Sequence, residues 1–274
     1  MRLSVLVPIY YKENPQHVAE CFDSLARQIR RADEIVLVED GPLTAELYEV
    51  IDHIAATMPE LRRVQLPEHT ELGHVLAVGI EHCTGELVAR MDSDDISHPE
   101  RFAIEEEYLM QHPDISVVGS WVDEFVEHPD QIISTRCVPE KHADILKFAH
   151  YRNPINHPSA MFRRQDVIET GNYQTFFYFE DYALWCRMLL QGKKFHNLQQ
   201  SLLSFRSGYD MFDRRGGWNY IESELKFQKF LFHTGFCRID QFLLNVFLRT
   251  TTRILPIRLR HWVYTTFLRR HRNS

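Results

Sequence analysis

In the first hundred residues, short apolar runs alternate with longer segments in which apolar residues recur every three or four positions. The apolar runs predict β-strands at residues 3–7, 35–38, 64–66 and 87–91. The periodic segments predict helices at residues 15–29, 44–57 and 73–83. Strands that alternate with helices form βαβ units, and strands this apolar are typical of a sheet covered on both faces. The pattern therefore predicts an α/β fold with a mostly parallel, Rossmann-like sheet and flanking helices.

The chain after this region is less regular. A helix is expected to begin with Ser97 as its N-cap, with Pro99 in the first turn and Glu100 completing a capping box, and to end near Gln111. Strands are expected at residues 115–122 and 159–162, with a polar irregular stretch at 127–140 between them. Two further helices are expected at residues 181–191, closed by Gly192, and at 220–233.

Composition limits the class of protein. A chain of 274 residues with 44% hydrophobic content can bury a full core, as one large α/β domain with an appendage or as two smaller domains. Its five cysteines are scattered and lack any C-x-x-C pair, so neither a disulfide framework nor a zinc knuckle is expected. The first apolar run stops at Pro8, too early for a secretory signal. A cytoplasmic protein is expected.

The net charge of −7 conceals a basic C-terminal segment. Residues 238–274 hold eight arginines against one acid, Asp240, so this segment carries +7 and the remainder −14. Apolar residues lie among the arginines in two expected helices divided by Pro256, and none of the apolar runs is long enough to span a membrane. We favour amphipathic helices on an anionic membrane surface. The alternative is a pair of terminal helices packed on the domain, with the arginines solvated.

A run of carboxylates follows the predicted strand at residues 87–91. Asp92 and Asp94 are two residues apart, so on an extended chain their side chains face the same side. Hard divalent cations such as Mg²⁺ and Mn²⁺ take oxygen ligands of this kind, often together with substrate phosphates. A turn with a helix cap is the alternative, because Asp and Ser favour both. The hexapeptide by itself leaves the choice open.

Polar residues also follow two other predicted strands. Tyr10 comes just after Pro8, and Glu39 and Asp40 come after the second strand. Ligands of doubly wound sheets bind beyond the carboxyl ends of the strands, so these groups are expected to converge. An aromatic ring there would stack on a base, and Asp40 would accept the imide N–H of a uracil. The glycine-rich loops of ATPases and nicotinamide enzymes are absent from the sequence, which argues against both classes.

Taken together, the motifs resemble glycosyltransferase family 2 over residues 3 to about 207. The matching segments are residues 4–10, 38–41, Gly73 with its helix, 85–95 followed by 99–101, 156–159, 180–185 and 202–206. The resemblance implies a GT-A fold, a nucleotide-sugar donor, a divalent metal (manganese or magnesium) and inversion at the anomeric carbon. We accordingly expect a catalytic domain at residues 1–215, with a nucleotide-binding half at 1–100 and an acceptor half at 101–215, and a basic helical region at 216–274.

The resemblance also implies roles for individual residues. Asp94 would bind the metal directly with Asp92 beside it, and Asp181 would be the catalytic base that removes the proton of the acceptor hydroxyl. Glu180 and Asp181 would alternatively cap the helix that follows them. The other expected donor-binding residues, at the uridine, ribose and diphosphate, are Pro8, Tyr10, Glu39, Asp40, Gly73, Arg90, Asp92 and Ser93.

Three further residues carry two readings each. His157 would contact the diphosphate or the acceptor, or else be structural. Trp185 would stack under a sugar, although a place in the core is favoured at that helix position. Arg206 would contact the diphosphate or form a surface salt bridge.

Within the family, the sequence looks most like bacterial enzymes that extend a lipid-diphosphate-linked sugar in O-antigen, capsule or exopolysaccharide synthesis. We expect a UDP-hexose donor, with glucose or galactose preferred, a β1,3 linkage, and a peripheral location on the inner face of the cytoplasmic membrane. No nucleic-acid partner is expected. The alternatives are a nucleotidyltransferase with the same kind of metal site and a non-catalytic sugar-nucleotide-binding scaffold. Glu39, Pro42 and Glu71 depart from the usual family residues, which leaves the donor sugar open.

Overall fold

The computed structural model describes residues 1–207 and 218–254. Its strands are β1 (Leu3–Tyr10), β2 (Glu34–Asp40), β3 (Leu61–Gln65), β4 (Leu87–Arg90), β5 (Ile96–Ser97), β6 (Ile115–Phe125), β7 (Ser134–Arg136), β8 (Met161–Arg163) and β9 (Lys194–Arg206). Its α-helices are α1 (Pro15–Ala26), α2 (Ala45–Thr57), α3 (Leu72–His82), α4 (Arg101–Gln111), α5 (His142–Ala149), α6 (Arg164–Glu169), α7 (Glu180–Leu190), α9 (Trp218–His233) and α10 (Ile239–Ile254). A 3-10 turn spans His157–Ser159. The expected domain boundary at residue 215 and the second terminal helix after Pro256 lie outside the described residues.

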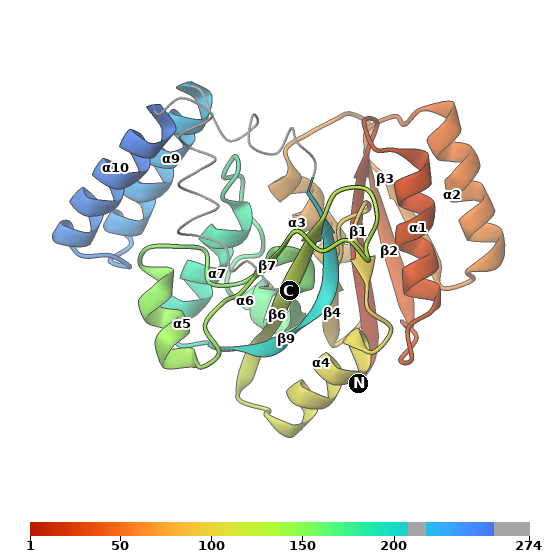
Figure 1. Ribbon diagram of the computed structural model, residues 1–274, viewed down its shortest axis with the longest axis horizontal. Helices are drawn as coiled ribbons and strands as arrows, with labels where there is room; N and C mark the ends of the chain where they lie inside the picture. The colour runs from red at the N-terminus through yellow and green to blue at the C-terminus, as the bar shows by residue number, and fades with distance from the viewer. Residues whose placement is uncertain (208–217, 255–274) are drawn as a thin grey trace.

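All strands of the described residues belong to one sheet, in the order β3-β2-β1-β4-β8-β6-β9-β5, with β7 beside β6 (Figure 1). The pairs among β1 to β4 are parallel, as expected, and so is the pair of β6 with β9. Strands β5, β7 and β8 pair antiparallel with their neighbours. The α/β class is therefore confirmed, and the sheet is parallel in its first half and mixed in its second.

Two hydrophobic cores lie on the two faces of this sheet. Successive residues of β1 alternate between them: Val5 and Val7 pack with α1, α2 and α4, whereas Leu6 packs with α3 and α7. The second core also takes residues from α5, α6 and α9. This alternation is what a strand with period two produces when both faces are covered. The helices therefore hold the sheet from both sides and leave the carboxyl ends of β1, β2 and β4 free for a site.

Some local predictions were wrong at the element ends. Strand β1 does not stop at Pro8, which is buried opposite Val38, and it continues to Tyr10. Ser97 is not a helix cap, because it lies in β5, where its N–H donates to Ser24 Oγ and its Oγ accepts from Gln28. Strand β8 begins only after the turn that contains Ser159. In each case a partner from a distant segment decides the local structure.

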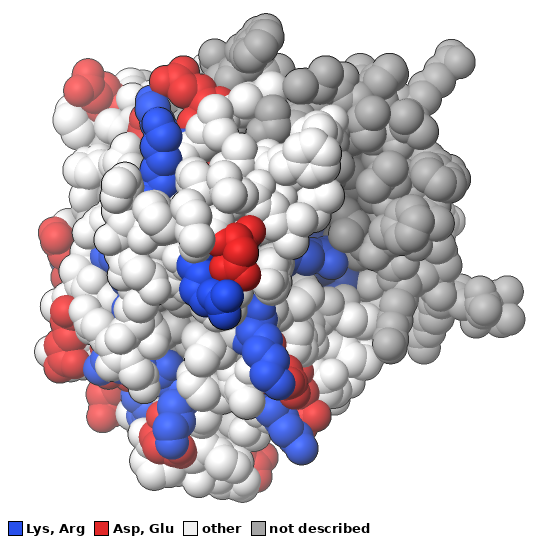
Figure 2. Space-filling model, turned by 90° about the vertical axis from the view of Figure 1, so that its left-hand side faces the viewer, with Lys and Arg blue, Asp and Glu red and all other residues white. Residues whose placement is uncertain are grey.

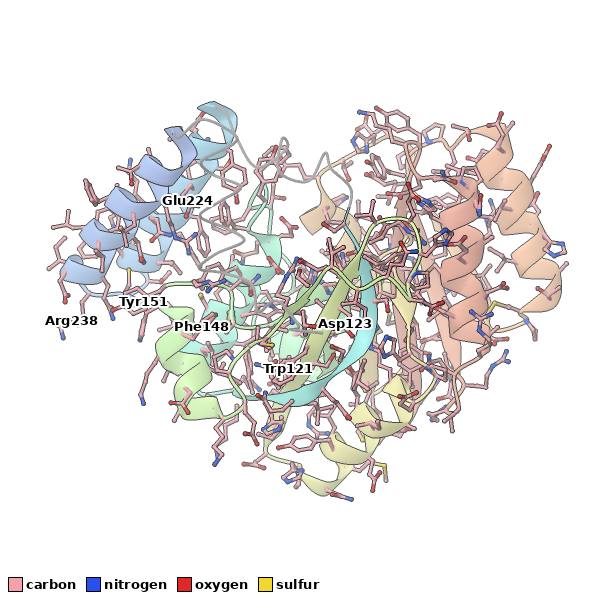
Figure 3. The ribbon with its side chains drawn as sticks, in the orientation of Figure 1. Trp121, Asp123, Phe148, Tyr151, Glu224 and Arg238 are labelled. Atoms are coloured by element: carbon pink, nitrogen blue, oxygen red, sulfur yellow. The ribbon has the colours of Figure 1, made fainter. Side chains whose placement is uncertain are left out.

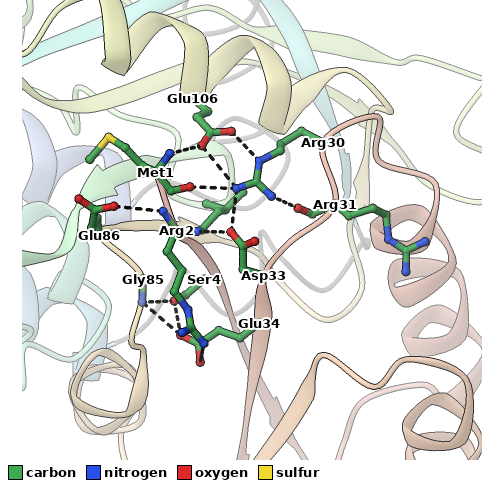
Figure 4. A network of polar contacts seen from close by, with 11 residues as sticks. Met1, Arg2, Ser4, Arg30, Arg31, Asp33, Glu34, Gly85, Glu86 and Glu106 are labelled. Carbon is green, nitrogen blue, oxygen red and sulfur yellow. Dashed lines mark hydrogen bonds and ion pairs between the residues drawn. The ribbon is translucent and has the colours of Figure 1, made fainter.

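Glu34 anchors the amino end of the sheet, opposite the strand ends described above (Figure 4). Its carboxylate accepts hydrogen bonds from Ser4 Oγ, from the N–H and hydroxyl of Thr84, and from the N–H of Gly85. Burial by itself would raise the pKa of Glu34, but these hydrogen bonds and the charge of Arg2 outweigh it, so the pKa lies below its usual value.

Replacing Glu34 with Gln is expected to lower the free energy of unfolding by about 2 kcal/mol at pH 7, as for other hydrogen bonds to a buried charge. A lowered pKa means that the carboxylate stabilises the fold above its unfolded-state pKa of about 4.3 and loses this effect as the pH falls through the folded-state pKa. Urea unfolding of both proteins at pH 7 and pH 3 tests this. The gap between them should shrink at pH 3, and an equal gap at both pH values would contradict the ionic role.

Helices α9 and α10 pack side by side as a hairpin at one end of the molecule (Figure 1). Glu224, which points from α9 toward α10 in Figure 3, forms an ion pair with Arg249 at 2.9 Å. Arg249 also donates to the carbonyl of Tyr151, and Arg238 pairs with Asp240. The pair of Arg238 with Asp240 involves the one acid of the basic segment, whereas Arg249 is neutralised by Glu224, an acid that precedes this segment in the sequence. The arginines at 253–272 lie beyond the described side chains.

The opposite side of α10 is apolar and exposed. Figure 2 looks onto this side of the molecule and shows broad uncharged surface interrupted by separate charged side chains. Five large apolar residues of α10 are between 46% and 65% exposed: Ile239, Leu243, Leu244, Phe247 and Leu248. Within the described residues, no helix is long and apolar enough to cross a membrane.

Candidate active site

Three strand ends meet at one edge of the sheet, as the sequence predicts. Parallel pairing places Tyr10 of β1 beside Asp40 of β2, and β4 lies on the other side of β1 with Arg90 at its end. The acidic residues 92–95 follow β4 directly. Because these strands run in the same direction, their carboxyl ends form one continuous rim. The residues expected at the nucleobase and those expected at the metal therefore lie along the same rim.

At the metal end of the rim, Asp92, Asp94 and Asp95 each offer a carboxylate oxygen within 4.8 Å of the others. Burial, followed by the charge of Asp92, raises the pKa of Asp94 to about 6. Burial and its acidic neighbours also raise the pKa of Asp95. Several carboxylates held this close repel one another, and a divalent cation would relieve that repulsion. The donor set, all carboxylate oxygens, fits Mg²⁺ or Mn²⁺.

Asp95 and Arg206 hold the acidic loop, residues 92–95, in place through hydrogen bonds and an ion pair. Asp95 is fully buried and accepts the backbone N–H of Arg206 at 2.8 Å. The Arg206 guanidinium donates to the carbonyl of Asp94 at 2.9 Å and pairs with Glu20 at 2.6 Å. The alternative of a salt bridge is therefore found, with Glu20 as the partner, although Arg206 itself is only 8% exposed and its side chain holds the loop in place. Ser93, between the two expected metal ligands, is also buried.

Arg90 is a buried cation at the centre of the site. It is 2% exposed and forms an ion pair with Asp92. Its Nε and Nη1 atoms are buried without a hydrogen-bond partner among the described residues. Donors buried in this way cost free energy unless a partner is supplied, so they mark a place where a ligand oxygen fits. The charge of Arg90 also lowers the pKa values of Glu180 and Asp181, although burial raises both more strongly.

Glu180 and Asp181 begin helix α7. Asp181 accepts hydrogen bonds from Asn153 Nδ2 at 2.6 Å and from the N–H of Tyr182 at 2.7 Å. Burial raises the pKa of Asp181, and burial with the charge of Asp181 raises that of Glu180 to about 8. Asp181 is thus oriented by two donors in a setting that makes it more basic than an ordinary aspartate. Capping and catalysis are compatible here, because one carboxylate can serve both.

His157 is buried at the back of this region and does not carry charge. Its Nε2 lies 2.9 Å from the hydroxyl of Tyr173. Burial, and then the charge of Arg90, lower the pKa of His157 well below its usual value. A neutral ring is expected at pH 7, so His157 provides no cation for a diphosphate. Its geometry favours the structural reading, with Tyr173 as a partner that the sequence did not indicate.

Trp185 belongs to the core and cannot stack under a sugar. The side chain is fully buried. Its ring makes edge contacts with Phe162, Phe195 and His157. Its position on α7 turns it toward the sheet, which is why the core reading holds.

Gly73 acts through close packing at the start of α3. A Cβ atom added there would lie 2.7 Å from the carbonyl oxygen of Gln174 and 3.2 Å from Cβ of Glu180. Any larger residue would push the segment before α7 away from the sheet. Gly73 therefore lets the segment that leads to the acidic pair pack closely on α3, and its expected contact with the donor stays a prediction.

At the nucleobase end, Tyr10 and Asp40 lie beside His69. The rings of Tyr10 and His69 are stacked with centroids 5.9 Å apart, and His69 Nδ1 is 2.6 Å from Asp40 Oδ2. Asp40 Oδ1 accepts the N–H of Thr70 at 2.7 Å. Gly41 makes this approach possible, because its φ is +77° and a Cβ there would lie 2.6 Å from the His69 nitrogen.

Two expected donor-binding residues lie away from this surface. Glu39 is 1% exposed, forms an ion pair with Arg63 at 2.5 Å and accepts a hydrogen bond from Gln65 at 2.9 Å. Its buried carboxylate therefore links β2 to β3. Pro8 is buried within β1. The direction of Glu39 follows from the alternation of side chains along a strand. Neighbouring residues face opposite sides, and Asp40 occupies the side that faces the site.

The sequence did not indicate His69, Thr70, Asn153 or Tyr173. Each of them comes from a loop, or from the edge of one, and reaches the site only through tertiary packing. For His69 and Thr70, the sequence offers only a weak signal: they are polar residues that lie shortly before the helix expected to begin at Gly73.

Comparison with known proteins agrees with this geometry. The family model described as glycosyl transferase family 2 matches residues 4–185. The amylovoran biosynthesis glycosyltransferase AmsE of Erwinia amylovora is 40% identical over 264 residues, which cover 95% of this chain and 97% of that protein. The UDP-Gal:alpha-D-GlcNAc-diphosphoundecaprenol beta-1,3-galactosyltransferase of Escherichia coli is 32% identical, over 98% of this chain and 97% of its own.

Among solved structures, the mannosyltransferase PcManGT of Pyrobaculum calidifontis, in complex with GDP-Man and Mn²⁺, superposes with a TM-score of 0.64. The match covers 94% of this chain and 71% of that one at 18% identity. This likeness confirms the GT-A-type fold. The extent of the family match and the two close relatives show that this chain belongs to glycosyltransferase family 2.

Proposed function

We propose that this glycosyltransferase transfers a hexose, preferably glucose or galactose, from a UDP-sugar to a lipid-diphosphate-linked sugar during synthesis of a bacterial surface polysaccharide. The relatives support this proposal, since one is named for amylovoran biosynthesis and the other for a diphosphoundecaprenol-linked acceptor. A β1,3 linkage is our preference on the same basis. Family membership weighs against the alternative of a nucleotidyltransferase.

The observation that carries the proposal is the position of Arg90. It pairs with Asp92 on the metal side and acts on Asp181 and Glu180 on the acceptor side. An inverting transfer needs a leaving-group site and a base on opposite sides of one anomeric carbon. The Nε and Nη1 donors of Arg90 are buried without a partner among the described residues, and an oxygen of the donor's diphosphate would satisfy them.

The chemistry then follows from these residues. Asp181 takes the proton of the acceptor hydroxyl as its oxygen forms a bond to the anomeric carbon. The bond from that carbon to the diphosphate breaks, and its electron pair leaves with UDP. Asp94 and Asp92 would hold Mn²⁺ or Mg²⁺, which when bound offsets charge on the diphosphate. An α-linked donor gives a β-linked product.

A transfer assay tests the function. The protein would be incubated with Mn²⁺, an alkyl-diphosphate-linked GlcNAc acceptor and a panel of UDP-sugars, and both UDP release and product mass would be measured. One UDP-hexose is expected to give acceptor-dependent UDP and a product heavier by one hexose. UDP release that never depends on any acceptor of this class would contradict the proposal and favour the sugar-nucleotide-binding scaffold.

We propose in addition that the basic C-terminal region attaches the enzyme to the inner face of the cytoplasmic membrane, where such an acceptor would be presented. The exposed apolar side of α10 and the arginines that follow in the sequence support this proposal. After Asp240 the chain contains no further acid. An apolar surface followed in the sequence by arginines without accompanying acids suits the headgroup region of an anionic bilayer.

Removing residues 238–274 is expected to weaken binding to anionic liposomes, but it also removes the packing of α10. A variant that changes only the charge therefore gives a clearer test. In it, Arg is replaced by Gln at residues 258, 260, 269, 270 and 272. Because each basic residue near an anionic surface contributes about 1 kcal/mol, binding should fall at least a hundredfold. Sedimentation with anionic and with neutral vesicles provides the measurement and its control. Equal binding of the charge variant and the wild type to anionic vesicles would contradict the role of the tail.

A further inference from the structure

Two exposed aromatic residues are separated from the acidic pair of α7 by one residue, Phe179. Phe177 is 49% exposed and Tyr178 is 39% exposed. Their ring centroids are 4.1 Å apart and their planes are tilted by 53°, so the two rings touch and present adjoining aromatic faces. Large aromatic residues usually bury more of their area, and an exposed pair is informative when it borders a site.

The segment that carries this pair is held at both ends. Gln174 and Glu180 both approach Gly73, so the two ends of the segment lie next to each other at the start of α3. On the other side, Phe176 packs on Phe230 and Phe179 stacks on Phe227, both from α9. Phe176 and Phe179 therefore anchor the segment between α3 and α9, which lie on either side of it in Figure 1. Phe177 and Tyr178, between these two anchors, remain exposed.

The backbone of Tyr178 is strained. Its φ is +71°, and among the described residues other than glycine only Asn172 shares a positive φ. Asn tolerates that region, whereas a bulky residue adopts it at a cost of about 1–3 kcal/mol. The ring of Tyr178 is held by Tyr220 of α9, with centroids 4.8 Å apart. Strain that packing maintains in this way is concentrated at functional sites.

We propose that Phe177 and Tyr178 form the platform on which the sugar ring of the acceptor rests. This inference rests on the proposed function, because it needs Asp181 to act on an acceptor hydroxyl. A pyranose presents a face of C–H groups, and aromatic rings offer a large, rigid apolar surface for it. The platform is joined through Phe179 to Glu180 and Asp181, so a ring resting on it lies near the base. The stacking role that Trp185 cannot perform falls to residues nearer the start of α7.

The occupant is a sugar of the acceptor and not the donor. The nucleobase and diphosphate positions lie along the ends of β1, β2 and β4, whereas the platform lies on the α7 and α9 side of Asp181. The same helix α9 also supports α10, whose exposed apolar side is the proposed membrane contact. An acceptor whose lipid lies in the bilayer would therefore approach the base from this direction.

Binding measured without catalysis tests the platform. Calorimetry would follow an alkyl-diphosphate-linked GlcNAc titrated into protein saturated with UDP and Mn²⁺. The variants are Phe177→Ala and Tyr178→Gly, the second chosen because glycine adopts the positive φ without strain. Acceptor affinity is expected to fall about tenfold in each, the size of a lost aromatic contact. UDP affinity should not change.

Two controls complete the experiment. Phe177→Trp keeps an aromatic surface and should retain affinity, and Phe232→Ala removes an exposed aromatic of α9 away from Asp181 and should have no effect. Variants that bind an acceptor as tightly as the wild type would overturn the platform alone. Wild-type protein that binds no member of a panel of hexose and N-acetylhexosamine diphosphate lipids would overturn the proposed acceptor, and the platform with it.

Discussion

Replacing Asp181 with Asn is expected to lower kcat for sugar transfer by about three orders of magnitude, within the range that general bases contribute. The substitution keeps the shape of the side chain, so UDP binding should remain as in the wild type. What is lost is the ability to accept a proton, since an amide is not basic. UDP release in the presence of acceptor measures the first effect, and calorimetry with UDP and Mn²⁺ measures the second.

Glu180 provides the matched control. Because its pKa is raised to about 8, it is mostly protonated at pH 7, and Glu180→Gln replaces one neutral group by another. This variant is expected to keep most of its activity. If Glu180→Gln loses transfer and Asp181→Asn retains it, the roles of the two carboxylates are reversed and Glu180 is the base.

Replacing Asp94 with Ala is expected to abolish the gain in UDP affinity that Mn²⁺ produces, a loss of about a hundredfold for a metal ligand. The carboxylate would join the ion to the protein, and the ion would join the diphosphate. Stability should not fall, because burial and the charge of Asp92 disfavour the ionised form of Asp94 in the folded protein. Removing Asp94 relieves this repulsion, so an unchanged or higher Tm is expected.

Titration of UDP with and without Mn²⁺ checks this expectation, with Asp144→Ala as an exposed control outside the site. The control should respond to Mn²⁺ as the wild type does. Should Asp94→Ala respond to Mn²⁺ like the wild type, the ion is held by other groups and the metal assignment is wrong.

The strand ends show how far a sequence can predict a site. Asp40 and Asp92 were placed on one rim because parallel strands end at the same edge, and the register of β1, β2 and β4 confirms that geometry. Glu39 was assigned to the same surface by its position in a motif, but it faces the other way and pairs with Arg63. Motif proximity does not determine which side of a strand a residue occupies, whereas alternation does.

The acceptor side was less predictable. Trp185 is of the residue type that stacks on sugars, but its position on α7 directs its side chain into the core. Asn153 orients Asp181 from a distant loop, with no pattern in the sequence to connect them. Likewise, Arg249 belongs to a basic tail in the sequence but is neutralised by Glu224 in the structure. Such pairs depend on packing between elements that are far apart along the chain.

Periodicity and short motifs are local properties of the chain, and they were enough to predict the α/β class, the first four strands, the family and the acidic loop after β4. Folding was needed to show that Arg90 is buried and paired with Asp92, that Arg206 supports the loop, and that Phe177 and Tyr178 remain exposed shortly before Asp181. The physical reason is that burial, charge pairing and side-chain direction depend on the neighbours that folding supplies.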